Sequence, residues 1–180
     1  IRGYNREEGP HGALSIELRP AFASWLGWLV PDDRPLVFVL DRDQDRDELV
    51  RQCLKIGYED LAGELAGGMT AWRAAGLKES SIALARDAPS DRPILDVRQR
   101  SEFASGHLPG ALHAELGSLS SAVGGVPAGP LATMCGHGQR AMTAASVLER
   151  AGRRDITVVS SGASDWATTT SIPAGSTRSC

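Results

Sequence analysis

The stretch Met134-Cys135-Gly136-His137-Gly138-Gln139-Arg140-Ala141 decides how this chain folds. An apolar run over 130–134 precedes it and predicts a buried strand, and apolar residues at helical spacing follow over 141–151. Such a strand–loop–helix unit aims loop N–H groups and a helix N-terminus at the cysteine sulfur, which favours the thiolate. Two glycines let the loop curl round an anion without side-chain clashes. We therefore expect a sulfur nucleophile that faces an anionic substrate.

Composition excludes several classes of protein. The 180 residues are 42% hydrophobic with a net charge of −3, and no Lys/Arg block is long enough to indicate binding to nucleic acid or a membrane surface. No apolar run reaches the roughly 18 residues of a membrane span, and no secretory signal pattern occurs. No zinc-binding His/Asp cluster occurs, and we expect neither a metal nor a cofactor. Because the sequence begins at Ile1 rather than Met, we expect a processed protein or a piece of a longer one.

The three cysteines indicate a cellular compartment. Cys53, Cys135 and Cys180 do not make a disulfide framework. Disulfides are rare where thiols are kept reduced, so we expect a cytoplasmic protein.

The chain repeats itself at a spacing of about 94 to 98 residues. Residues 12–18 match residues 110–116, and further anchors keep the same order. These anchors pair Arg46 with Arg140, Gly68 with Gly162, Trp72 with Trp166, and Ile1-Arg2 with Val97-Arg98. Two copies of one module explain this order. We expect the boundary in the polar stretch 78–92, which gives modules at 1–80 and 81–180.

Alternating strands and helices predict an α/β fold in which each module is a parallel sheet flanked by helices on both faces. In the second copy we expect strands over 93–97, 111–114, 130–134 and 156–160, with helices over 101–105 and 141–151. In the first copy we expect strands over 36–40 and 60–62 and a helix over 45–56. This copy is expected to lack its first strand, because the residue matching Asp96 would precede residue 1. Ligands of parallel sheets bind beyond the carboxyl ends of strands, where Cys135 is expected.

Four blocks of the second copy resemble the rhodanese (sulfurtransferase) family. They are Asp96-Val97-Arg98, Glu102-Phe103 with residues 106–111, Cys135-x-x-Gly138-x-Arg140, and residues 162–166. Weaker versions at 10–13 and 67–72 make the whole chain resemble a tandem rhodanese arrangement. The run 22–31 also resembles the first of two rhodanese modules that follow a metallo-β-lactamase-fold domain in some bacterial fusion proteins. That hydrolase domain is absent from this sequence, and an upstream copy of it would be a partner.

The resemblance implies a sulfur-transfer mechanism. Cys135 would take the outer sulfur of thiosulfate or a glutathione-type persulfide, become a persulfide, and pass the sulfur to a thiol or cyanide acceptor. Loop N–H groups would stabilise the negative charge on sulfur. The expected substrate-binding residues are Gly136, His137, Gly138, Gln139 and Arg140. Arg140 would brace the loop or meet the donor. His137 would bind the donor, tune the thiolate or simply face solvent.

Several residues are expected to support this site rather than react. Asp96 and Arg98 would anchor the module through a carboxylate–guanidinium contact near the loop, and Glu102 would join them. His107 is expected to be a satisfied turn histidine. The remaining residues expected to serve in packing are Cys53, Trp72 and Trp166, while Cys180 is expected to be incidental.

The first copy differs at the position of the chemistry. Asp41 stands where Cys135 stands in the second copy, and a carboxylate cannot accept a sulfane sulfur. Three aspartates within 41–46 also repel anions. The first module is therefore expected to be catalytically silent.

Two further functions are open to a cysteine–arginine loop. Cysteine phosphatases of related fold place five residues between the cysteine and the arginine, whereas this loop has four, which favours a sulfur-sized pocket. The chain could instead be a persulfide carrier or docking module of a metallo-β-lactamase-fold hydrolase or persulfide dioxygenase, with little turnover alone. The physiological donor and acceptor and the oligomeric state are left open by the sequence.

Overall fold

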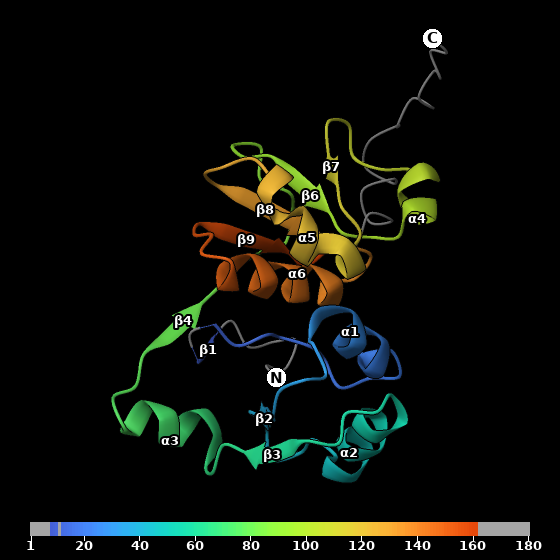
Figure 1. Ribbon diagram of the computed structural model, residues 1–180. Helices are drawn as coiled ribbons and strands as arrows, with labels where there is room; N and C mark the ends of the chain where they lie inside the picture. Colours follow the sequence, from blue (N-terminus) through green and yellow to red (C-terminus); the bar gives the residue numbers. More distant parts are fainter. Residues whose placement is uncertain (1–7, 11, 162–180) are drawn as a thin grey trace.

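The computed structural model describes residues 8–10 and 12–161, which form two parts that lie one above the other (Figure 1). The N-terminal part holds β1 (Glu8–Pro10), α1 (Phe22–Leu29), β2 (Leu36–Phe38), α2 (Arg46–Lys55), β3 (Leu61–Glu64), α3 (Gly68–Ala74) and β4 (Glu79–Ser81). The C-terminal part begins with β5 (Ala83–Ala85), β6 (Ile94–Asp96), α4 (Arg100–Ala104), β7 (Leu112–His113) and η1 (Leu116–Ser118). It continues with α5 (Leu119–Ala122), η2 (Val123–Gly125), β8 (Leu131–Met134), α6 (Gln139–Arg150) and β9 (Ile156–Val159).

A five-stranded parallel sheet organises the C-terminal part. Its strand order is β5-β9-β8-β6-β7, which places β8 at the centre between β6 and β9. All four residues of β8 are buried, as expected for a continuous apolar run that is covered on both faces. This confirms the α/β fold with a parallel sheet that the sequence predicts for the second copy.

Helix α6 lies between this sheet and the N-terminal part (Figure 1). Every side chain from Ala141 to Glu149 is buried, which is unusual for a helix and follows from its having neighbours on both sides. The hydroxyl of Thr133 on β8 donates to the carbonyl of Ala141 at 3.0 Å. On the other side, the backbone N–H of Ser15 donates to the hydroxyl of Ser146 at 2.9 Å. The helix therefore ties the two parts together.

One hydrophobic core runs through both parts. Fully buried members include Phe22 in the N-terminal part and Leu116 and Leu148 in the C-terminal part. Cys53 belongs to the same cluster with no exposed surface, which confirms its expected packing role. Trp72 is half-buried and its indole N–H donates to the carbonyl of Lys78 at 3.1 Å. The expectations for Ile1-Arg2, for position 11 of the 10–13 block, for the block 162–166 and for Cys180 fall outside the described residues.

The N-terminal part departs from the expected parallel sheet with helices on both faces. Among the described residues it contains one parallel pair, β2 with β3, and a separate antiparallel pair, β1 with β4. Strand β2 is therefore paired on one edge only, and no sheet of this part is broad enough to carry helices on both faces. The prediction that residues 1–80 form a complete module with a parallel sheet between helices is wrong in this respect. The N-terminal part shares only part of the architecture of the C-terminal part.

The stretch 78–92 also differs from expectation, because it holds two strands and is not simply a polar boundary. Strand β4 pairs with β1, and β5 pairs in parallel with β9 at the edge of the large sheet. Between them Ile82 is 3% exposed. The physical reason is that β1 and β9 offer strand edges with which these small and polar residues pair, although Leu84 stays 39% exposed.

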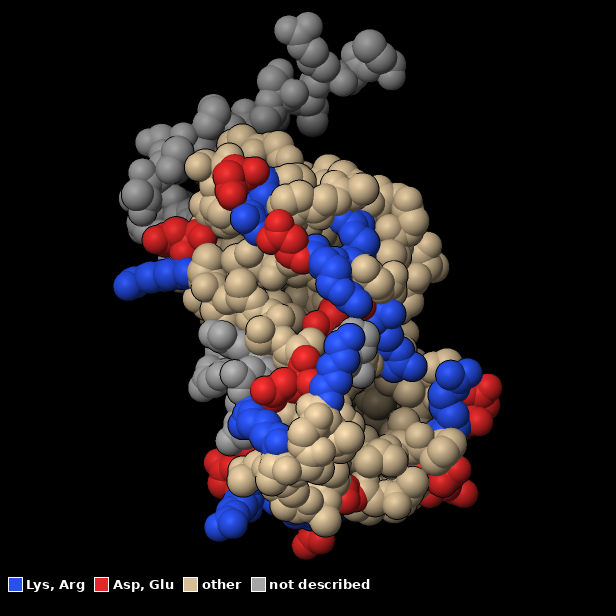
Figure 2. Space-filling view, turned by 90° about the vertical axis from the view of Figure 1, so that its left-hand side faces the viewer, with Lys and Arg blue, Asp and Glu red and all other residues tan. Residues whose placement is uncertain are grey.

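Figure 2 shows basic and acidic side chains interleaved on one face of the molecule. In the described part of the chain, no helix is long and apolar enough to cross a membrane.

Candidate active site

Cys135 lies at the carboxyl end of the central strand β8. The strand ends at Met134, and α6 begins at Gln139, so a loop of three residues follows the cysteine before the helix. Gly138 caps the helix with φ of 84°, a left-handed conformation that glycine adopts without steric cost. This turn brings the N-terminus of a 12-residue helix to the loop that follows Cys135, and such a terminus favours negative charge. Cys135 as a whole residue is 1% exposed.

Arg140 sits in the first turn of α6 and is clamped by Glu102. Its two terminal nitrogens lie 2.5 and 2.9 Å from the two carboxylate oxygens of Glu102. One of them is 3.5 Å from where a Cβ on Gly136 would lie, so the guanidinium packs against the loop backbone. Donation to Glu102, and further the charge of neighbouring Cys135, hold the pKa of Arg140 above its ordinary value. The guanidinium is thus held against the loop, and the choice between the two expected roles of Arg140, bracing the loop or meeting the donor, stays a prediction.

Glu102 is held in turn by its own helix. Its carboxylate accepts the backbone N–H of Gln99 at 3.1 Å, and the two residues form a capping box at the start of α4. The hydrogen bond from Arg140 is the main cause that lowers the pKa of Glu102 below its usual range. The carboxylate is thus ionised at neutral pH and fixes the orientation of the arginine.

Asp96 and Arg98 form a buried ion pair. Asp96, at the end of β6, is fully buried and Arg98 is 8% exposed. The guanidinium nitrogens lie 2.6 to 3.0 Å from the carboxylate oxygens, and one also donates to the carbonyl of Gly106 at 2.7 Å. The expected carboxylate–guanidinium contact is therefore present. Glu102 does not join it, because α4 turns that side chain toward Arg140 instead.

An aromatic stack supports the second block of the motif. The ring of Phe103 stacks on His107 with centroids 3.8 Å apart, and His113 stacks on it with centroids 4.3 Å apart. His107 Nδ1 is hydrogen-bonded to the carbonyl of Phe103 at 2.9 Å, which confirms a satisfied turn histidine. Sequence reasoning missed His113, whose Nε2 bonds the carbonyl of Arg98 at 2.9 Å. Its signal was a histidine inside an otherwise apolar strand over 111–114.

The remaining loop residues differ in their exposure. The side chain of His137 is exposed, whereas Gly136 and Gln139 are half-buried. Thr133, which sequence reasoning also missed, ties β8 to the first turn of α6 through its bond to the carbonyl of Ala141. Among the described residues, no three His, Cys, Asp or Glu side chains lie together as a metal site requires.

The loop that begins at Asp41 in the N-terminal part presents carbonyl oxygens to a cation, in contrast to the loop expected around Cys135. The Arg46 guanidinium forms two hydrogen bonds with Glu64, at 2.9 and 3.0 Å. The third guanidinium nitrogen of Arg46 donates hydrogen bonds to the carbonyl oxygens of Asp41, Arg42 and Gln44 at 2.6 to 3.3 Å. The N–H of Asp41 is occupied by the side-chain carbonyl of Gln44 at 2.8 Å. Loop carbonyls thus point inward to a cation here, so this loop is no cradle for an anion.

The Glu102–Arg140 pair predicts a pH dependence of stability. Because the pKa of Glu102 is lowered in the folded protein, its contribution is complete above the usual glutamate range and is lost as pH falls below about 4. Glu102→Gln is expected to cost roughly 1 kcal/mol, since the Glu102 side chain is 38% exposed and screened by solvent. Denaturant unfolding of both proteins from pH 8 to pH 3 measures this. A difference that stays constant down to pH 3 would contradict the ion-pair account.

The fold and this loop together define an α/β domain that presents a cysteine at the carboxyl edge of its central strand. The rhodanese-like domain family matches residues 81–169. Thiosulfate sulfurtransferase GlpE of Pseudomonas putida (strain GB-1) is 31% identical over 77 residues, which are 42% of this chain and 70% of that protein. The chain belongs to the rhodanese-like family.

Solved structures of similar domains were also found. The Rhodanese_3 like domain of the Anabaena sp. Alr3790 protein is 24% identical, with 43% of this chain and 92% of that chain covered and a TM-score of 0.41. The human single-domain sulfurtransferase TSTD1 is 21% identical, with 57% and 91% covered and a TM-score of 0.41.

Proposed function

We propose that the chain is a sulfurtransferase that works through a persulfide on Cys135. The observation that carries this proposal is the placement of Cys135 between the carboxyl end of β8 and the N-terminus of α6, with Arg140 held against the same loop. A helix N-terminus and loop N–H groups favour negative charge on sulfur. The Cys135 thiolate attacks the outer sulfur of thiosulfate or a glutathione-type persulfide. The sulfur–sulfur bond of the donor breaks, and sulfite or a thiolate departs with the electron pair.

The second half of the cycle removes the sulfur. An acceptor thiolate, or cyanide in an assay, attacks the outer sulfur of the persulfide and the Cys135 thiolate is released, as in other two-step covalent mechanisms. Backbone N–H groups of residues 136–140 stabilise the charge in both steps. Arg140 acts mainly as a brace and a fixed positive charge, because both terminal nitrogens are engaged by Glu102. Exposed His137 meets the donor at the mouth of the loop.

The N-terminal part is proposed to be a diverged copy of the same module. Support comes from the element order β2-α2-β3, which matches β8-α6-β9, and from the parallel pairing of β2 with β3, which matches that of β8 with β9. Asp41 replaces the nucleophile, and the carbonyls around Arg46 replace the anion-binding N–H groups. This copy serves as a scaffold that covers α6.

Asp41→Cys tests this division of labour. The substituted thiol is expected to gain no persulfide and no turnover, because the loop around it presents carbonyl oxygens to Arg46 rather than N–H groups to an anion. The measurement is the mass of the Asp41→Cys, Cys135→Ser double variant after incubation with thiosulfate or glutathione persulfide. Uptake of one sulfur atom at position 41 would show that the first loop is only missing its nucleophile.

Thiosulfate is the first donor to test, since the curated relative is named as a thiosulfate sulfurtransferase. The loop holds no charged side chain apart from Arg140, so a glutathione-type persulfide is an equally suitable donor on electrostatic grounds.

A reactive thiol needs a reducing compartment, and on this ground we place the chain in the cytoplasm.

Steady-state turnover with each donor and with cyanide or a thiol acceptor tests the proposed function. Double-reciprocal plots of initial rate against donor concentration, one for each acceptor concentration, are expected to be parallel for a two-step covalent mechanism. Loading without turnover would instead assign the carrier role, with a separate metallo-β-lactamase-fold hydrolase domain as partner. Release of phosphate from a phosphoprotein or p-nitrophenyl phosphate, with no sulfur transfer, would favour the phosphatase alternative.

A further inference from the structure

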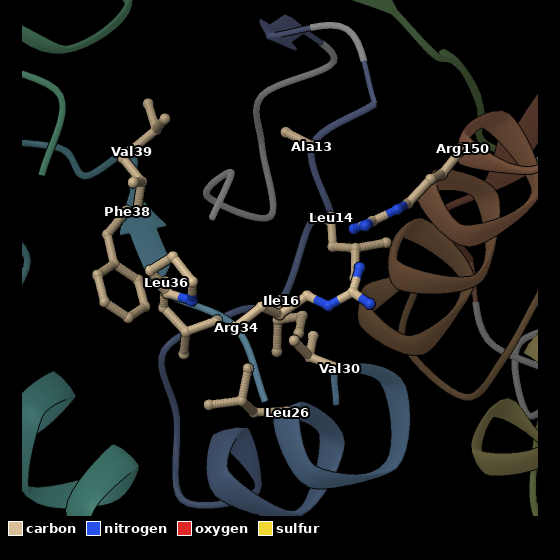
Figure 3. A pocket seen from close by; sticks show the side chains of 12 residues that line it. Ala13, Leu14, Ile16, Leu26, Val30, Arg34, Leu36, Phe38, Val39 and Arg150 are labelled. Carbon is tan, nitrogen blue, oxygen red and sulfur yellow. The ribbon is translucent and has the colours of Figure 1, made fainter. Parts of the chain in front are cut away.

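A cavity with apolar inner walls is lined by residues of both parts of the molecule (Figure 3). The walls belong to the core of the N-terminal part, because Ile16, Leu26 and Phe38 are 1%, 3% and 6% exposed. The cavity volume is about 210 Å³. This is roughly the volume that seven water molecules occupy in the liquid, so the cavity has room for a small molecule only.

Two arginines line the same cavity. Arg34 comes two residues ahead of β2, and Arg150 is the last residue of α6. In Figure 3 their guanidinium groups point toward one another beside Leu14. The same three residues also line a second cavity, of about 280 Å³. Two cationic groups from different parts of the chain therefore converge at one edge of an apolar space.

No carboxylate of the cavity walls balances these two charges. Arg150 is exposed and makes no hydrogen bond or ion pair within the described part of the chain. Arg34 donates to Asp33 through Nε at 3.1 Å, and its two terminal nitrogens make no hydrogen bond to a described residue. No Asp or Glu is among the described residues that line either cavity. Because like charges repel, an anion placed between the two guanidinium groups would be stabilised by both.

We propose that this cavity binds a small carboxylate that carries an apolar chain of about six to eight carbons. The chain lies against Ile16, Leu26 and Phe38, and the carboxylate lies between the guanidinium groups of Arg34 and Arg150. A guanidinium presents paired N–H donors that match the two oxygens of a carboxylate. The apolar walls add affinity in proportion to the length of chain that they remove from water.

Ligands that have only one of these two features fit the cavity less well. A neutral apolar molecule would take hydration from the two guanidinium groups without offering them an acceptor. An inorganic anion would satisfy the arginines but would leave the apolar walls uncovered. Only a ligand with both a charged head and an apolar chain is complementary to both parts of the cavity.

The proposed site is separate from the loop of Cys135. Arg150 ends α6, whereas the loop precedes Gln139, the first residue of that helix. The rise of an α-helix places these two ends about 17 Å apart. Binding of the carboxylate therefore does not rest on the proposed sulfur chemistry.

Calorimetric titration of the full chain with hexanoate tests the proposal. The expected Kd is about 0.1 to 1 mM, as for a well-placed ligand of this size. The controls are 1-hexanol, hexylammonium and acetate, which lack the charge, reverse it or lack the chain. Each is expected to bind at least about 10-fold more weakly. From butanoate to octanoate each methylene is expected to tighten binding about fourfold, and longer chains should gain nothing more.

Charge variants separate the head group from the chain. Arg34→Gln and Arg150→Gln are each expected to weaken hexanoate binding at least about 10-fold, but to change 1-hexanol binding less than about two-fold. Arg150→Lys should restore part of the affinity, because it keeps the charge without the fork. Arg51→Gln is the matched control, since Arg51 is exposed on α2 and does not line the cavity. It should leave hexanoate binding unchanged.

A pair of filling variants tests which cavity holds the chain. Ala13 lines the cavity of the proposal, and Ser120 lines only the second cavity. Ala13→Phe should remove hexanoate binding, whereas Ser120→Phe should not. A circular dichroism melt of each variant reports whether it is folded.

Four results would overturn the proposal. They are no saturable binding of hexanoate up to about 20 mM, equal binding of hexanoate and 1-hexanol, equal binding of hexanoate and acetate, and unchanged hexanoate binding in both Arg→Gln variants. Sulfur loading of Cys135 is measured in the same variants and is expected to be unchanged. A failure of the proposed function is thereby seen separately from a failure of this site.

Discussion

Cys135→Ser is expected to lower thiosulfate-to-cyanide turnover by at least about 1000-fold. A serine hydroxyl cannot form the persulfide through which both half-reactions pass. The substitution exchanges one small side chain for another at a 1% exposed position, so the fold should persist. Initial rates with saturating donor measure the effect, and a circular dichroism melt of the same sample reports whether the variant is folded.

Cys53→Ala is the matched control for this variant. Burial raises the pKa of the Cys53 thiol to about 11, so this cysteine is not a thiolate near neutral pH. It lies on the buried side of α2 in the N-terminal part, whereas Cys135 follows β8 in the C-terminal part. Its removal should leave turnover within about two-fold of the parent while costing some stability. A folded Cys135→Ser variant that keeps more than a tenth of the parent rate would contradict the assignment of the nucleophile.

Asp96→Ala is expected to produce the largest loss of stability, about 3 to 5 kcal/mol in the free energy of unfolding. The substitution leaves the Arg98 guanidinium, which is only 8% exposed, without its carboxylate partner. One carbonyl, that of Gly106, remains as an acceptor and cannot neutralise the charge. For a protein of this size, the expected fall in Tm is of the order of 10 °C. Denaturant unfolding followed by fluorescence measures the free energy directly.

The control is an ion pair of the same kind on the surface. Asp33 and Arg34 lie 3.1 Å apart, with side chains 68% and 58% exposed. Asp33→Ala should change stability by less than about 0.5 kcal/mol, because exposed pairs gain little over hydration. Equal effects of the two substitutions would show that burial of the Asp96–Arg98 pair is not what matters.

Short-range patterns predicted most of the C-terminal part correctly. The run Leu131–Met134, the glycine turn and the helical spacing after it are local features, and the strand, loop and helix lie within two residues of the expected bounds. The contact of Asp96 with Arg98 joins residues two positions apart, so it too could be expected. These features depend on neighbours along the chain.

Features that depend on distant neighbours were not predictable in the same way. Glu102 and Arg140 are 38 residues apart, and the direction in which α4 points its carboxylate decides the pairing. Strands β4 and β5 form because β1 and β9 offer edges to polar, small residues that would otherwise read as a linker. The carbonyl-lined loop around Arg46 needs the position of Glu64, which comes from β3. Charge counting led to the prediction that the loop of Asp41 is silent, but it did not predict this arrangement of carbonyls around Arg46.

The most direct test of the central claim is the intact mass of the protein after brief incubation with thiosulfate or glutathione persulfide and removal of the donor. The account predicts a gain of one sulfur atom, located by peptide mapping on Cys135, lost on addition of cyanide and absent from Cys135→Ser. No gain with either donor, or a gain that maps to Cys53 or Cys180, would contradict it.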